Sequence, residues 1–142
     1  STTRRRPPAR TTPIICSASS STKWRRGPDV RIANADAALK QIHHALRPGG
    51  VALITVPGIT PVDRGEWKES WYWSFTKPAM QKTMAQIFPA ANVTAQNFGN
   101  VLVANALLYG MGLPELKKEQ MDYTDPHYQV IITVKAVKPQ AA

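Results

Sequence analysis

The hydrophobic pattern becomes regular after residue 34. Apolar residues recur every three or four positions between residues 36 and 46, which predicts an amphipathic helix with Asn34 or Asp36 as its cap. A proline and two glycines at 48–50 end it, and Val51–Val56 follows as an apolar run without alternation, typical of a strand buried on both faces. A helix, a tight turn and such a strand form half of a crossover unit, so the pattern predicts an α/β architecture. The apolar helix positions are Leu39, Ile42 and Leu46.

Four further elements follow along the chain. Thr76 can cap a helix that has Pro78 in its first turn, and residues 92–97 read as a short strand near a sheet edge. Val101–Tyr109 is apolar nearly all round, which predicts a buried helix that Gly110 ends. Tyr128–Val137 is the clearest strand, since its apolar residues alternate. The apolar positions expected in these elements are Met80, Met84, Ile87, Phe88, Ile132, Val134 and Ala136.

The connection at 57–76 has a composition of its own, because it holds five of the eleven aromatic residues of the chain. Ligands of open α/β sheets bind beyond the carboxyl ends of the strands, so a loop leaving Val56 lies where a site is expected. The rings could equally cover the end of the sheet, as aromatic residues do in any core. The loop acids at 63, 66 and 69 have no histidine beside them, so we expect no metal site. The aromatic residues are Trp67, Trp71, Tyr72, Trp73 and Phe75.

The formal net charge of +9 is concentrated at one end of the chain. Residues 1–31 hold eight basic side chains and one acidic one, a net of +7, whereas residues 32–142 hold ten and eight, a net of +2. We therefore divide the chain into a basic Ser, Thr, Arg and Pro-rich tail at 1–33, expected to be mostly disordered, and a partial α/β domain at 34–139. Such a tail suggests a non-catalytic module that binds nucleic acid or another polyanion. That alternative is the weaker one, since Trp24 is the only aromatic residue available in the tail for stacking on bases.

Composition excludes several other classes of protein. A single cysteine excludes a disulfide scaffold and a thiolate zinc cluster. No apolar run approaches the roughly 20 residues of a membrane-spanning helix, and no apolar segment of a secretory signal follows the arginines. We therefore expect a cytoplasmic protein without a membrane span.

Two motifs resemble a known family. The helix–Arg-Pro-Gly-Gly–strand segment from Ala37 to Pro57 and the sequence Trp-Tyr-Trp-Ser-Phe-Thr at 71–76 are similar to the late part of class I methyltransferases, which use S-adenosylmethionine. The resemblance covers about residues 35–139 and ends with the strand at 130–138. It implies the C-terminal half of a Rossmann-like sheet, with three to four strands, an antiparallel final strand and flanking helices.

The resemblance also implies a function. The parent enzyme would transfer a methyl group to a small-molecule, lipid or sugar-type acceptor, with S-adenosylmethionine as cofactor. Family members bind that cofactor on the first half of the sheet, through a glycine-rich turn and an acid at the end of the second strand, and neither is found in this sequence. We therefore expect the isolated chain to be inactive and to bind the cofactor weakly or not at all. We assign no catalytic base, and the residues implied on the acceptor side are Pro57, Gly58, Trp67, Trp71, Tyr72 and Trp73.

The missing half has two explanations and one consequence. The chain is either a truncated methyltransferase, or residues 1–33 come from a shifted reading frame. Separately, Ile14-Ile15-Cys16 resembles the remnant of a family strand. In both cases a strand edge is left unpaired, and unpaired edges invite association. We therefore predict self-association through this edge.

Overall fold

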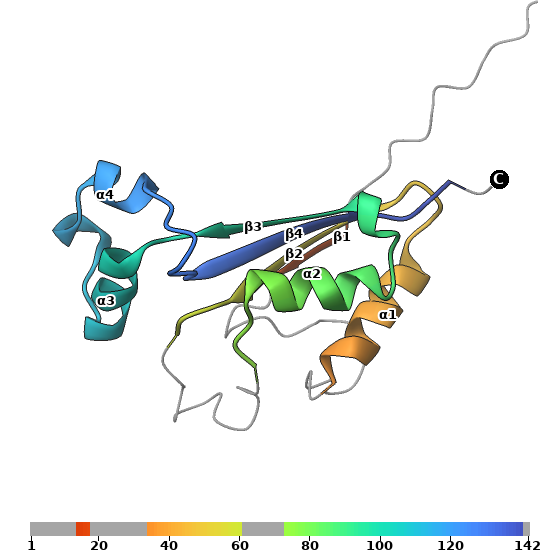
Figure 1. Ribbon diagram of the computed structural model, residues 1–142, viewed down its shortest axis with the longest axis horizontal. Helices are drawn as coiled ribbons and strands as arrows, with labels where there is room; N and C mark the ends of the chain where they lie inside the picture. Colours follow the sequence, from red (N-terminus) through yellow and green to blue (C-terminus); the bar gives the residue numbers. More distant parts are fainter. Residues whose placement is uncertain (1–13, 18–33, 61–72, 141–142) are drawn as a thin grey trace, which may run out of the picture.

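The computed structural model describes residues 14–17, 34–60 and 73–140. Four strands in these ranges form one sheet with the order β1-β2-β4-β3. β1 (Ile14–Ser17) is parallel to β2 (Val51–Pro57). β4 (Ile131–Val137) lies between β2 and β3 (Val93–Phe98) and is antiparallel to both (Figure 1). The predicted α/β sheet with an antiparallel final strand is therefore confirmed.

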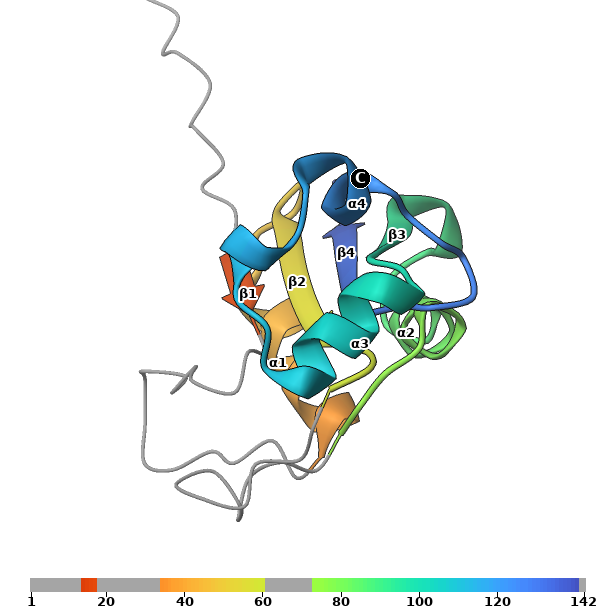
Figure 2. The same cartoon turned by 90° about the vertical axis from the view of Figure 1, so that its left-hand side faces the viewer.

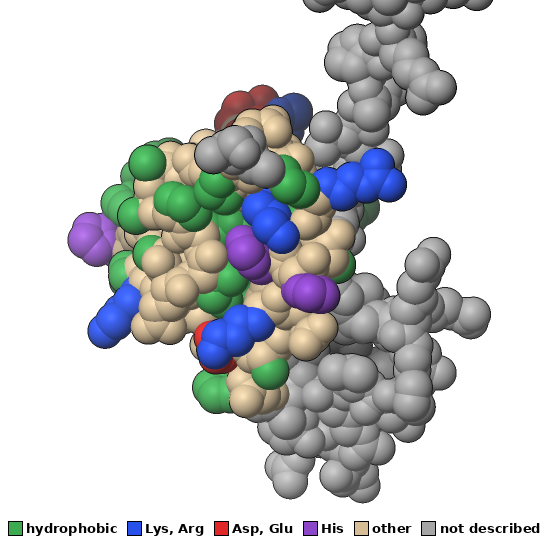
Figure 3. Space-filling view, turned by 90° about the vertical axis from the view of Figure 1, so that its right-hand side faces the viewer, with side chains coloured by type: hydrophobic (Ala, Val, Ile, Leu, Met, Phe, Trp, Pro, Cys, Tyr) green, Lys and Arg blue, Asp and Glu red, His purple; other side chains and the backbone are tan. Residues whose placement is uncertain are grey.

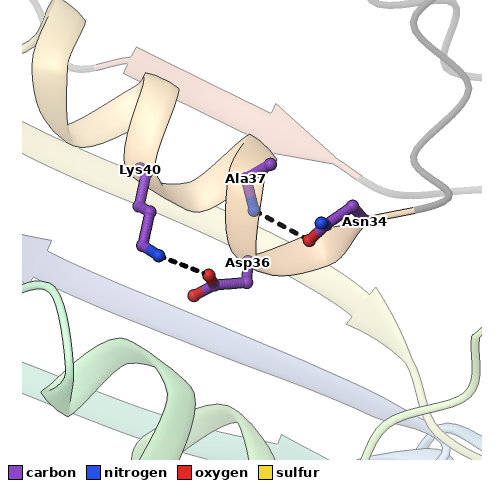
Figure 4. Close-up of polar contacts among 4 residues, drawn as sticks. All are labelled: Asn34, Asp36, Ala37 and Lys40. Atoms are coloured by element: carbon purple, nitrogen blue, oxygen red, sulfur yellow. Dashed lines mark hydrogen bonds and ion pairs between the residues drawn. The ribbon is translucent and has the colours of Figure 1, made fainter.

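Two helices cover one face of this sheet (Figure 1). In α1 (Ala35–Ala45), the Asn34 side chain accepts a hydrogen bond from the Ala37 backbone N–H at 3.0 Å, as predicted for a cap, and Lys40 pairs with Asp36 at 2.6 Å (Figure 4). α2 (Lys77–Ala85) begins at the predicted Thr76 cap, whose hydroxyl oxygen accepts from the Ala79 N–H at 3.2 Å.

The core lies between these helices and the sheet. Along β2 and β4 every second residue is buried, as the pleat of a strand requires. Phe88, Met80 and Met84 come from α2 and the turn after it, and they are at most 2% exposed. The predicted apolar faces of α1, α2 and β4 are therefore the faces that form the core. The sheet contributes Ala52, Ile54, Val56, Ala95, Ile132, Val134 and Ala136 to it.

The prediction that the strand at 51–56 is buried on both faces is wrong. Residues between the buried positions of β2 are half-buried or exposed, and Leu53 is 36% exposed. The cause is the placement of α1 and α2 on the same face (Figure 1), which leaves the opposite face of the described sheet without a helix. In the register of that face, Leu53 lies opposite Lys135 and Thr55 lies opposite Thr133. We call this the open face.

The prediction of a buried helix at 101–109 is also wrong. α3 (Val101–Tyr109) has the predicted limits, with Asn100 as its cap and Gly110 in the left-handed region at φ 71°. However, it lies past the end of the sheet (Figure 1) and in front of the strands when seen from that end (Figure 2), where it contacts α4 (Lys118–Asp122) rather than lying between layers. An apolar sequence predicts burial only if another element covers it, and in α3 only two alanines are buried.

The remaining elements are short. β1 forms where Ile14-Ile15-Cys16 suggested a family strand, and its residue Ile15 pairs with Leu53 of β2. The other residues of the 1–33 tail lie outside the described part of the chain. Turns of 3₁₀ helix at Ala90–Asn92 and Leu113–Glu115 connect the larger elements. The strand predicted from residue 128 begins at Ile131, because residues 125–129 form a turn and loop that lead into β4.

Candidate functional site

The carboxyl ends of β2 and β3 meet at one edge of the sheet. Both strands run antiparallel to β4, so they are parallel to each other, and Pro57 and Phe98 both pair with Ile131. α2 begins at the same edge, since the loop that leaves β2 leads into it. In open α/β sheets this is the edge where ligands bind.

Pro57 and Gly58 are held by backbone hydrogen bonds across this edge. The Pro57 carbonyl oxygen accepts from the Phe75 N–H at 2.9 Å, and the Gly58 N–H donates to the Val130 carbonyl oxygen at 2.9 Å. A Cβ on Gly58 would overlap the carbonyl oxygen of Gln129. Glycine is therefore required here by a close approach of two backbone segments.

Gln129 is a residue of this edge that the sequence did not single out. Its side-chain Oε1 accepts from the Lys77 N–H at 2.7 Å, which satisfies a free donor in the first turn of α2. Its backbone carbonyl oxygen accepts from the Ile59 N–H at 2.9 Å. No local pattern could have indicated this role, because the residues it joins are about 50 to 70 positions away in the sequence.

The described aromatic residues of the loop have two different environments. Phe75 is half-buried and packs against the core, as expected for a ring that covers the end of a sheet. Trp73 is 47% exposed and stacks on Phe75, with ring centroids 6.1 Å apart and an interplanar angle of 27°. The Phe75 N–H bonds to the Pro57 carbonyl oxygen, so Trp73 is two residues in sequence from a contact with the end of β2. The other three candidates, Trp67, Trp71 and Tyr72, lie outside the described residues.

A small hollow lies beside the end of β3. Its volume is about 290 Å³, near the lower end of the range for small-molecule sites. Amide, hydroxyl and ammonium groups surround one aromatic ring, and the Asn97 side chain is fixed by a 3.1 Å hydrogen bond to the Asp125 carbonyl oxygen. The lining is mostly polar, and the hollow is open to solvent. It consists of Lys77, Gln96, Asn97, Phe98 and Thr124.

His43 of α1 has a structural role. Its ring meets Phe88 edge-on, with centroids 4.8 Å apart and an interplanar angle of 87°. Burial lowers the pKa of His43, and the charges of Lys138 and His44 lower it further. The Lys138 ammonium donates to the carbonyl oxygens of His43 and Leu46, both at 2.9 Å, and so satisfies free acceptors at the end of α1.

The described surface gives little for a metal or a polyanion. Across the described ranges, no three His, Cys, Asp or Glu side chains lie close enough together to hold a metal ion. Figure 3 shows one face of the molecule, on which the Lys and Arg side chains stand apart from one another rather than in one patch. Among the helices of the described chain, none has the length and apolar character needed to cross a membrane. A cytoplasmic location stays a prediction from the sequence.

The described glycines do not form a cradle for S-adenosylmethionine. Gly58 and Gly99 are packed against Gln129 and Val130, so their backbones face protein atoms. Gly110 ends α3, and nothing in the described part places a glycine-rich turn after a strand. The described residues therefore do not fit the cofactor that the sequence resemblance implies.

Comparisons with known proteins gave likenesses to solved structures only. No protein-family model matches the chain, and no curated protein matches its sequence. Phosphoethanolamine N-methyltransferase 2 of Haemonchus contortus, in complex with phosphomonomethylethanolamine and S-adenosylhomocysteine, is 19% identical over 77% of this chain, with a TM-score of 0.47. The same enzyme in complex with S-adenosyl-L-methionine is 18% identical over 78% of this chain, with a TM-score of 0.45. The chain spans 31% of the length of each of these structures.

Proposed function

We propose that this chain is the acceptor-side portion of an S-adenosylmethionine-dependent methyltransferase. Its parent enzyme would methylate a small-molecule, lipid or sugar-type acceptor, and the chain alone would be inactive. The observation that carries the proposal is the sheet order. The methyltransferase-like motifs imply a final strand that runs against its neighbours, and β4 lies antiparallel between β2 and β3.

The proposed acceptor residues follow the end of β2. Pro57 and Gly58 set the direction of the loop through their bonds to Phe75 and Val130. Trp73 offers a half-exposed ring that stacks on Phe75. In the proposal Trp67, Trp71 and Tyr72 belong to the same acceptor surface. Methyl transfer depends mainly on holding the acceptor in line with the methyl donor, so a fixed backbone at the end of β2 and flat aromatic rings suit this task without a catalytic base.

In this proposal the parent enzyme binds the cofactor through residues outside this chain. The chain should therefore bind acceptors in the absence of S-adenosylmethionine. Its affinity for them should be low, because only the acceptor side of the site is present. The hollow lined by Lys77 and Asn97 adjoins the same sheet edge and would take a polar part of the acceptor.

Nuclear magnetic resonance of the full chain tests this. We would titrate a ¹⁵N-labelled sample with S-adenosylhomocysteine and, separately, with a panel of amino alcohols, sugars and short-chain lipids. The expected result is that at least one acceptor class shifts the amide signals of 57–60 and 73–77, whereas S-adenosylhomocysteine shifts none. Trp73→Ala should weaken acceptor binding severalfold. Leu53→Ala, on the open face, is the matched control and should leave binding unchanged.

Two results would overturn the proposal. Calorimetry that gave stoichiometric, micromolar binding of S-adenosylmethionine would show that the cofactor site is in this chain. A panel in which every compound left the signals of 57–60 and 73–77 in place would remove the acceptor role.

A further inference from the structure

The outward side of α3 is the most apolar exposed surface of the described chain. Residues 101–112 contain no charged side chain, and six large apolar residues among them are at least 41% exposed. Surfaces of this kind on soluble domains usually mark an interaction site. The six residues are Val101, Leu102, Leu107, Leu108, Tyr109 and Met111.

Five residues of α3 form a continuous exposed stripe. At the helical rotation of 100° per residue, residues 108, 101, 105, 109 and 102 follow one another around an arc on the order of 120°. The buried residues Ala104 and Ala106 lie at the two edges of this arc, and Leu107, 43% exposed, lies opposite its centre. Asn105 lies at the centre of the arc, with apolar residues on both sides. We call Val101, Leu102, Asn105, Leu108 and Tyr109 the α3 stripe.

We infer that the α3 stripe pairs with the same stripe of a second copy of this chain. If two α3 helices lie antiparallel about a two-fold axis at Asn105, Val101 faces Tyr109 of the other copy and Leu102 faces its Leu108. Each apolar residue then meets an apolar residue, as a self-complementary two-fold interface requires.

Asn105 gives this pairing its register. An amide side chain carries both a donor and an acceptor, so two Asn105 side chains on the axis can bond to each other. A polar residue at the centre of an apolar helix seam is a known way to fix register, because any other register leaves the amide buried without a partner.

Charge favours a second copy over a lipid surface. Helices that lie on membranes carry many basic residues beside their apolar side. Around α3, residues 99–125 hold two basic side chains, Lys117 and Lys118, and four acidic ones, a net of −2. This surround lacks the basic residues that an anionic lipid surface attracts, and the like charge of two copies, −2 each, opposes their pairing only weakly because salt screens it.

The size of the stripe limits the strength of the dimer. A specific interface buries at least about 1,000 Å² in total, or about 500 Å² on each copy, and the stripe of one short helix is a small surface on that scale. Tyr109 is 85% exposed and would contribute most, since aromatic residues dominate the energy of such interfaces. A weak dimer in the micromolar range is therefore expected.

Sedimentation velocity of the full chain, from about 10 µM to about 1 mM, tests this inference. The expected result is a monomer–dimer equilibrium that tightens at higher salt, because apolar pairing is opposed only by weak charge repulsion. Asn105→Asp keeps the shape of the side chain and puts two carboxylates on the axis, so it should raise the dissociation constant at least tenfold. Leu108→Glu should do the same. Leu53→Glu, the same substitution on the open face, should leave the constant within twofold.

Each contrary result removes the inference. A chain that stays monomeric over the whole concentration range has no such interface. Association that both α3 variants retain and Leu53→Glu abolishes belongs to the open face. If the chain is monomeric and pellets with neutral phosphatidylcholine vesicles in a manner that Leu108→Glu prevents, the stripe binds lipid instead. Thermal unfolding followed by circular dichroism shows that each variant is folded.

Discussion

The two faces of the sheet are built from the same strands, but one is buried and the other is exposed. On the covered face Ile54 and Val134 pair under α1 and α2 and are at most 5% exposed. On the open face Leu53 pairs with Lys135 and is 36% exposed. The difference teaches that stability in this domain is concentrated on one face, and that apolar residues elsewhere are available for contacts with other molecules.

The largest expected effect is a difference in stability between two Phe→Ala variants. Phe88→Ala should lower the free energy of unfolding by about 3–5 kcal/mol, because Phe88 is 2% exposed under the covered face. Phe98→Ala should lower it by less than about 1 kcal/mol, because this ring is 45% exposed at the end of β3. Urea unfolding followed by circular dichroism measures both. Equal losses would mean that the two faces contribute alike.

The second effect concerns the junction between β2 and β4. Gly58→Ala should cost about 1–3 kcal/mol, because the new methyl group would overlap the Gln129 carbonyl oxygen. Gly112→Ala is the control, since its new Cβ would meet only the Pro114 ring at an ordinary 3.5 Å. It should change the free energy of unfolding by less than about 0.5 kcal/mol. A tolerated Gly58→Ala would contradict the close approach.

Two helix caps compare a buried amide with an exposed one. The Asn100 side chain is 4% exposed, accepts from the Val103 N–H and donates to two carbonyl oxygens near α4. Asn100→Ala should therefore cost about 2 kcal/mol, because it leaves buried groups unpaired. Asn34→Ala removes one exposed bond to Ala37 and should cost about 0.5–1 kcal/mol. Chemical denaturation measures the two losses, and a larger loss at Asn34 would reverse the comparison.

The smallest effect is a dependence on pH. Since burial lowers the pKa of His43, the unfolded chain binds a proton more readily than the folded chain does. The contribution of His43 is fully present above about pH 6.5, the pKa of an unperturbed histidine, and is lost as the pH falls through the lowered value. Urea midpoints between pH 7.5 and 5 measure this. His43→Gln should flatten the curve, whereas the exposed His44→Gln, which removes only the smallest of the three causes, should flatten it much less.

The sequence determined the local structure of this protein. Its caps, breakers and apolar periods place α1, α2, β2, β3 and α3 within a few residues of their observed limits, because those signals act over one or two helical turns. The antiparallel final strand followed from a resemblance in two motifs. Even the three apolar residues Ile14-Ile15-Cys16 indicated where β1 forms.

The tertiary structure decided which surfaces are covered. Val51–Val56 and α3 are both apolar in sequence, and both were expected to be buried. α1 and α2 lie on the same face of the sheet, however, and α3 extends past its end, so Leu53, Leu108 and Tyr109 are exposed. The role of Gln129 was hidden for the same reason, since its partners come from β2 and α2. Burial depends on what packs against a residue, and the identity of that residue alone does not contain this information.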